Sequence, residues 1–193
     1  MAETAPAFST GLPELDALFP LRGIPYGQLI EITGGVSSGK TSLLLKLLAH
    51  LTRTGVAAYI DFSSTFFPSA AAVSGVDLTR LLVVKPDSRP TDRVKTGLRT
   101  AELLLRNQTV NVIVFDLVGE KQVLPIVLLH RLRLKTVRAR ALTIFLTENN
   151  SEIIPSSMAS LRLEVLRSGS DRLKVHLTKS RICREGTQAE VLL

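Results

Sequence analysis

The chain has 193 residues, of which 45% are hydrophobic and 21% are charged, with a formal net charge of +7. This length and apolar content predict a single folded domain over residues 1–193 with a substantial core. The lone cysteine, Cys183, excludes an internal disulfide framework and suits a reducing cytoplasm. The first ten residues lack a basic, apolar leader and no apolar run could span a bilayer, so we expect a cytoplasmic protein without a membrane partner. The positive charge favours polyanionic partners without indicating specificity.

Segments with strand and helix character alternate through most of the chain. We expect strands at residues 28–33, 56–62, 81–85, 110–116 and 142–147, and helices at 42–50, 68–74, 91–107 and 123–139. Beyond these, apolar positions alternate by twos in the segments 161–166, 172–177 and 189–193, which indicates antiparallel strands with one wet face. The pattern predicts an α/β fold: a mostly parallel sheet flanked by helices, with an antiparallel C-terminal extension.

The most informative motif stands between the first of these strands and the first helix. Residues 34–41 read Gly-Gly-Val-Ser-Ser-Gly-Lys-Thr, a complete P-loop sequence. Main-chain N–H groups that converge between a strand end and a helix N-terminus hold phosphate, Lys40 reaches a β- or γ-phosphate, and the Thr41 hydroxyl ligates Mg²⁺. The alternative is a chance match in an apolar turn. The predicted nucleotide-binding residues are Gly34, Gly35, Val36, Ser37, Ser38, Gly39, Lys40, Thr41 and Ser42.

The segments around this motif resemble the core of the bacterial recombinase RecA. Residues 9–16 and 23–31 resemble the opening of that core, and residues 75–84 and 112–116 continue the match in register. The resemblance covers nearly the whole chain. It implies a RecA-like P-loop core, with ATP or ADP and Mg²⁺ as cofactors.

The resemblance also assigns roles to individual residues. Asp116 matches the Walker B acid, which orients Mg²⁺ together with Thr41; the alternative is an acid that merely ends a strand. Ser63 stands where recombinases carry the glutamate that activates water, and residues 67–70 lack the acid and tyrosine that meet adenine. Asp61 is the remaining candidate base, although its family counterpart is not catalytic. Because a missing general base costs about 10²–10⁴ in rate, we expect nucleotide binding with at most weak ATPase activity.

Further departures concern DNA binding and assembly. The two loops that hold DNA in recombinases are shortened, and residues 149–155 stand for the second of them. The sequence shows neither the N-terminal polymerisation module nor the small C-terminal domain of recombinases. The resemblance therefore implies that the chain does not form long filaments by itself.

Basic residues gather in the segment 130–140. The helical period places Arg131, Lys135 and Arg138 on one face, and Leu128, Leu132 and Leu134 are expected to point inward. Three interpretations stay open: a solvated face, a surface that contacts the phosphates of single-stranded DNA without reading its sequence, and a surface for an acidic partner protein. The candidate contacts are Arg131, Arg133, Lys135, Arg138 and Arg140.

A second basic pair, Lys179 and Arg181, lies between two expected edge strands. The resemblance implies a contact with the γ-phosphate of a neighbouring subunit, because a basic pair at these positions has that role in recombinase filaments. The alternative is a pair of ordinary exposed charges on a hairpin.

Within the RecA-like proteins, the sequence is similar to the diverged ImuA or SulA-like branch, and the segment 73–82 fits that branch. This similarity implies an accessory protein of damage-induced translesion synthesis that binds the RecA recombinase or translesion polymerase subunits, with single-stranded DNA as a further candidate. One rival is a minimal DNA-dependent ATPase or recombinase paralogue, which Ser63 disfavours. Another is a SulA-type cell-division inhibitor, which the complete P-loop disfavours.

Overall fold

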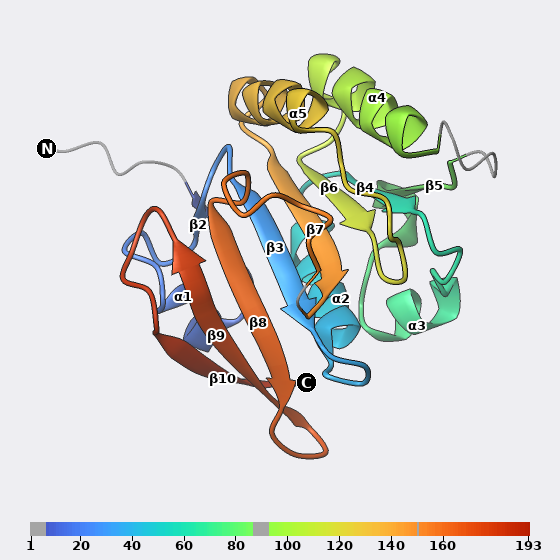
Figure 1. Ribbon diagram of the computed structural model, residues 1–193. Coiled ribbons are helices and arrows are strands. Elements are labelled where there is room, and N and C mark those ends of the chain that lie inside the picture. Colours follow the sequence, from blue (N-terminus) through green and yellow to red (C-terminus); the bar gives the residue numbers. More distant parts are fainter. Residues whose placement is uncertain (1–6, 87–92, 150) are drawn as a thin grey trace, which may run out of the picture.

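The computed structural model describes residues 7–86, 93–149 and 151–193, and it centres on an eight-stranded sheet (Figure 1). The strand order is β10-β9-β8-β3-β7-β6-β4-β5. Strands from β8 to β5 pair in parallel, whereas β9 and β10 pair antiparallel. Their bounds are β3 Leu29–Gly34, β4 Ala57–Asp61, β5 Leu81–Val84, β6 Val112–Asp116, β7 Leu142–Glu148, β8 Leu161–Arg167, β9 Arg172–Ser180 and β10 Gln188–Leu192. This architecture confirms the predicted α/β fold.

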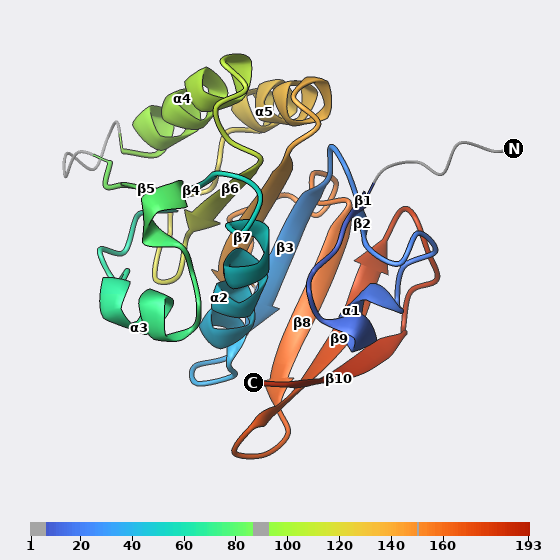
Figure 2. The same cartoon turned by 180° about the vertical axis from the view of Figure 1, so that it is seen from behind.

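Helices cover both faces of the sheet, as Figures 1 and 2 show from opposite sides. Helices α2 (Lys40–Leu51) and α3 (Pro68–Val73) lie on one face, and α4 (Arg93–Arg106) and α5 (Ile126–Arg138) lie on the other. Each face has its own apolar cluster because alternate residues of a strand point to opposite sides. The short elements are β1 (Ala7–Phe8), α1 (Pro13–Asp16), β2 (Ile24–Pro25) and the 3₁₀ turn η1 (Leu78–Arg80).

The bounds of several elements differ from the sequence-based expectations, and three of the differences concern α5, β8 and α4. Helix α5 begins at Ile126 and not at residue 123, because the extended Pro125 forms its N-cap. Strand β8 was expected to belong only to the antiparallel extension, but it also pairs in parallel with β3 and so joins the two parts of the sheet. The expected helix at 91–107 is observed as Arg93–Arg106, and residues 91 and 92 lie outside the described part of the chain.

The parallel register brings the ends of the central strands together. Asp61 at the end of β4 is paired with Asp116 at the end of β6, and Gly34 at the end of β3 is paired with Glu148 at the end of β7. Strand β3 is buried along its whole length, which fits a central strand covered on both faces. The two predicted acids therefore lie at the same edge of the sheet as the P-loop sequence.

Within the described residues, no helix is both long and apolar enough to cross a membrane.

Candidate functional site

The P-loop sequence forms a tight turn between β3 and α2. Two of its residues adopt left-handed backbone conformations, Ser37 with φ 58° and Gly39 with φ 88°. A side chain at Gly39 would also collide with Leu173, because an added Cβ would lie 2.4 Å from its Cδ2 atom. Lys40 is buried, and its Nζ donates a hydrogen bond to the carbonyl oxygen of Gly35 at 3.0 Å. The motif thus folds into a compact loop in which the Lys40 side chain reaches back to Gly35, near the beginning of the loop.

The N-terminus of α2 has the properties of an anion site. The helix is 12 residues long, has no acidic residue in its first turn, and receives no side-chain cap from the described residues. Its first N–H groups are therefore free to bind an external acceptor. Ser38 is 7% exposed, and its buried hydroxyl has no partner among the described residues, although such groups are normally hydrogen-bonded. These features fit a bound phosphate, with the exposed Thr41 hydroxyl as the ligand for Mg²⁺.

Asp116 faces this loop from the end of β6. It is 3% exposed, and it lines a cavity of about 200 Å³ together with Lys40 and Thr41. The Tyr59 hydroxyl donates to Asp116 Oδ2 at 2.7 Å, and the main-chain N–H of Val118 donates to Oδ1 at 3.2 Å. Burial raises the pKa of Asp116 above its ordinary value, although the hydrogen bond from Tyr59 opposes this rise. The structure therefore brings together Lys40, Thr41 and Asp116, as the sequence predicted for a magnesium–nucleotide site.

The remaining lining of this cavity is largely apolar, and most of it comes from β4 and the segment that follows it. It consists of Leu45, Tyr59, Thr65, Phe66, Phe67, Ala70 and Val118. Burial, followed by the charge of Asp116, raises the pKa of Tyr59, so its hydroxyl remains protonated as a donor. The sequence analysis did not assign Tyr59 to the site. Its hydroxyl inside a buried strand could have indicated a polar partner nearby, because a buried phenol needs one.

The side chains at the two candidate positions for a catalytic base, Ser63 and Asp61, both take part in hydrogen bonds that hold neighbouring loops. The Ser63 hydroxyl donates to the carbonyl oxygen of Val118. Both carboxylate oxygens of the buried Asp61 accept main-chain hydrogen bonds at 3.1 Å, one from Thr65 and one from Phe66. Asp61 thus shapes the loop after β4, which explains a carboxylate here without a catalytic role.

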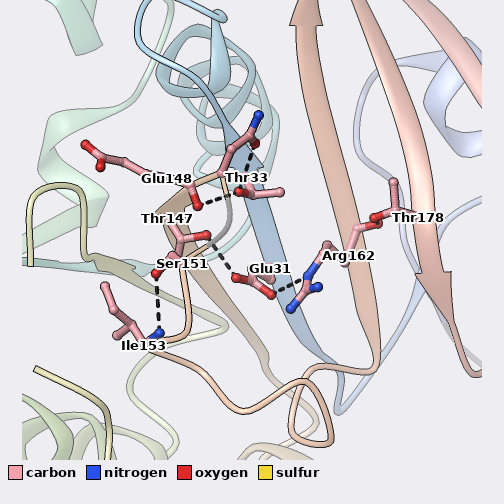
Figure 3. A network of polar contacts seen from close by, with 9 residues as sticks. Glu31, Thr33, Thr147, Glu148, Ser151, Ile153, Arg162 and Thr178 are labelled. Atoms are coloured by element: carbon pink, nitrogen blue, oxygen red, sulfur yellow. Dashed lines mark hydrogen bonds and ion pairs between the residues drawn. The ribbon is translucent and has the colours of Figure 1, made fainter. Parts of the chain in front are cut away.

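A second polar network lies where β3 runs between β7 and β8 (Figure 3). The buried Glu31 accepts a hydrogen bond from Thr147 at 2.9 Å, and it forms an ion pair with Arg162 at 2.7 Å. Thr33, close to the P-loop, donates to the carbonyl oxygen of Glu148 at 2.9 Å. The network joins β3, the strand that enters the P-loop, to its two neighbours β7 and β8. The sequence analysis did not predict this network. Glu31, an acid inside a largely apolar strand, was the feature that could have indicated it.

The basic residues of α5 lie apart from the P-loop. The helix ends at the opposite edge of the sheet, where the N–H of Gly27, just before β3, donates to the carbonyl of Ala141 at 2.8 Å. Arg140 stacks over Tyr26 at this edge, with 5.2 Å between its guanidinium and the ring centroid. Arg131 forms an ion pair with the buried Glu102 of α4 at 2.7 Å.

The faces of α5 differ in part from the expected ones. Leu132 is buried and Leu128 is half-buried, but Leu134 is 59% exposed, so its expected inward orientation is wrong. The buried face is centred on Leu129, Leu132 and Thr136, which leaves Leu134 on the outer side of the helix. Arg138 is exposed, whereas Arg133 and Lys135 are half-buried.

Lys179 lies inside β9 and not between two strands as expected, because β9 extends to Ser180; Arg181 follows directly. Both residues lie near the amino end of β8. Lys179 is paired with Arg162, and the Arg181 side chain donates to the carbonyl of Ser157. Burial, and then the nearby charges of Arg181 and Arg162, lower the pKa of Lys179. The pair therefore lies beside the Glu31 network and is not brought next to the P-loop of its own chain.

The sheet order, the strand–loop–helix unit and the paired acids at its edge define a RecA-like α/β core. The family described as "RecA N-terminal domain" matches residues 2–124, and the chain belongs to this family. Among curated proteins it is 38% identical over 114 residues to "Protein RecA" of Clostridium tetani, and 41% identical over 111 residues to that of Chlamydia pneumoniae. These matches cover 58% and 57% of this chain, but only 31% and 30% of the relatives.

Proposed function

We propose that the chain is a nucleotide-binding protein of DNA repair that holds ATP or ADP with Mg²⁺ at residues 34–42, from the end of β3 to the start of α2. The observation that carries this proposal is the N-terminus of α2, which no described side chain caps and whose Lys40 and Thr41 share one cavity with Asp116. The buried Ser38 hydroxyl in the same loop has no partner among the described residues. A bound Mg²⁺ would neutralise phosphate charge there, with Thr41 and Asp116 as the residues that hold its shell. Family membership supports the same ligand class.

The test is calorimetric titration with MgATP and MgADP. Replacing Lys40 by alanine removes a charge-assisted hydrogen bond worth about 1.5–3 kcal/mol, so ATP affinity should fall about 10–100-fold, and ADP affinity should fall less. Lys46→Ala is the matched control because it removes a lysine from α2 away from its N-terminus. Equal affinities of wild type and Lys40→Ala would exclude this site.

The proposed role is that of an accessory protein in damage-induced translesion synthesis. Ser63, at the position where the resemblance expects the water-activating glutamate, supports it, because a serine hydroxyl is not a base near neutral pH and such a site is better suited to holding nucleotide than to turning it over. Its proposed partners are the RecA recombinase and translesion polymerase subunits. Sedimentation of the purified chain with each partner, with and without MgATP, tests this role; failure to co-sediment with any of them would contradict it.

The second candidate is a minimal DNA-dependent ATPase. The arrangement of Lys40, Thr41 and Asp116 around one cavity favours it. Strong stimulation of ATP hydrolysis by single-stranded DNA would select this function over the accessory one.

A further inference from the structure

Tyr59 connects the apolar core to the metal-orienting acid. It lies in the middle of β4, is 2% exposed, and packs its ring 4.8 Å from that of Phe66. A buried phenol needs a partner for its O–H group. The partner is Asp116 Oδ2, at 2.7 Å on the neighbouring strand β6.

The acceptor positions of Asp116 are unequally filled. A carboxylate oxygen has about two lone-pair positions. Oδ2 accepts from Tyr59 at 2.7 Å and from the Thr65 hydroxyl at 3.4 Å, so both of its positions are used. Oδ1 accepts only from the N–H of Val118 among the described residues. One position on Oδ1 is therefore left to receive another donor.

We propose that Tyr59 is a positioning residue for magnesium–nucleotide binding: its hydroxyl fixes the Asp116 carboxylate so that Oδ1 is presented to the ion and its water shell. This inference rests on the proposed nucleotide site. The Tyr59 bond is the shortest of the three that hold Asp116, and its donor is anchored by a rigid, buried ring. A donor that orients a metal-associated carboxylate typically contributes 10–100-fold to metal affinity.

The experiment compares wild type with Tyr59→Phe, which removes only the hydroxyl and keeps the packing of the ring. A fluorescent ADP analogue is bound first in EDTA and then titrated with Mg²⁺. We expect the half-saturating Mg²⁺ concentration to rise about 10–100-fold in Tyr59→Phe, while the affinity for the analogue in EDTA stays unchanged. Thr65→Val removes the longer bond to the same oxygen and should shift the Mg²⁺ response in the same direction by less.

The control is Tyr26→Phe, because Tyr26 packs against Phe8 at the opposite edge of the sheet. It should leave both measurements unchanged. An unaltered Mg²⁺ response in Tyr59→Phe would overturn the inference, whatever the response of Thr65→Val. So would an equal loss of affinity in EDTA, since Tyr59 would then shape the nucleotide pocket itself. If wild-type protein bound no analogue at all, the nucleotide site and the inference built on it would both fail.

Discussion

The hydroxyl of Ser63 donates a hydrogen bond to the main-chain carbonyl of Val118, two residues beyond Asp116. The position that matches the water-activating glutamate of recombinases is therefore used to join the loop after β4 to the loop after β6. A neutral serine hydroxyl is too weakly basic to take a proton from water near neutral pH. This contact gives the expected loss of ATPase activity a structural basis.

We therefore predict slow ATP hydrolysis, well below the ordinary enzyme range of roughly 1–10³ s⁻¹. Ser63→Glu should raise the rate if the new carboxylate reaches the phosphate side of the loop, whereas Ser63→Ala should not. Phosphate release under saturating MgATP, with and without single-stranded DNA, measures both. Wild-type turnover inside the ordinary range would refute the argument and favour the recombinase alternative.

The Glu31–Arg162 pair should be important for stability. Loss of one partner of a buried ion pair costs about 3–5 kcal/mol, and we expect the lower end for Glu31→Ala because the Arg162 side chain is 29% exposed. Urea unfolding gives this free energy. Glu190→Ala is the matched control: its pair with Arg172 spans 3.6 Å between half-exposed side chains, so its loss should cost less than about 1 kcal/mol. Similar costs for the two variants would contradict the assignment.

Local patterns predicted most of the fold and the P-loop part of the site. The strand, the glycine-containing turn and the helix of residues 28–50 are contiguous, so their sequence carries the geometry directly. The role of Asp116 was assigned from the resemblance to the RecA core. Its position beside Asp61 follows from the parallel register, which brings the carboxyl ends of β4 and β6 together.

Contacts between distant segments were not predictable in this way. Tyr59 and Asp116 are 57 residues apart, and Glu31 and Arg162 are 131 apart, so no periodicity connects them. The inward orientation expected for Leu134 was wrong because a helical wheel shows which residues share a face and not which face the sheet covers. Strand order decides these questions, and it is a property of the whole chain.

Asp116 should lower the stability of the nucleotide-free protein at neutral pH. Its pKa is raised by burial, so the neutral acid stabilises the fold below the unfolded-state pKa of about 3.9, and this stabilisation is lost as pH rises through the folded-state pKa. Asp116→Asn should therefore melt higher than wild type near pH 7, and this advantage should vanish near pH 4. Thermal unfolding at both pH values measures the difference. The exposed Asp171→Asn is the control, and a lower melting temperature of Asp116→Asn at pH 7 would contradict the prediction.

Binding of single-stranded DNA, tested by fluorescence anisotropy over a range of salt, should be weak and tolerant of sequence. If α5 contacts phosphates, replacing Arg131, Lys135 and Arg138 together by alanine lowers the slope of log K against log salt. Each lost contact contributes about 0.7, and Arg131 is already paired with Glu102, so we expect a decrease of about 1.4.

The matched control replaces three basic residues of α4, namely Lys95, Arg99 and Arg106, because this variant loses the same net charge from the neighbouring helix. Its slope should stay close to that of wild type. Equal decreases in the two variants would indicate a general effect of net charge and not a surface on α5. An unchanged slope in the α5 variant would mean that these residues face a protein partner or solvent, and DNA would then have to be removed from the proposed ligands of this helix.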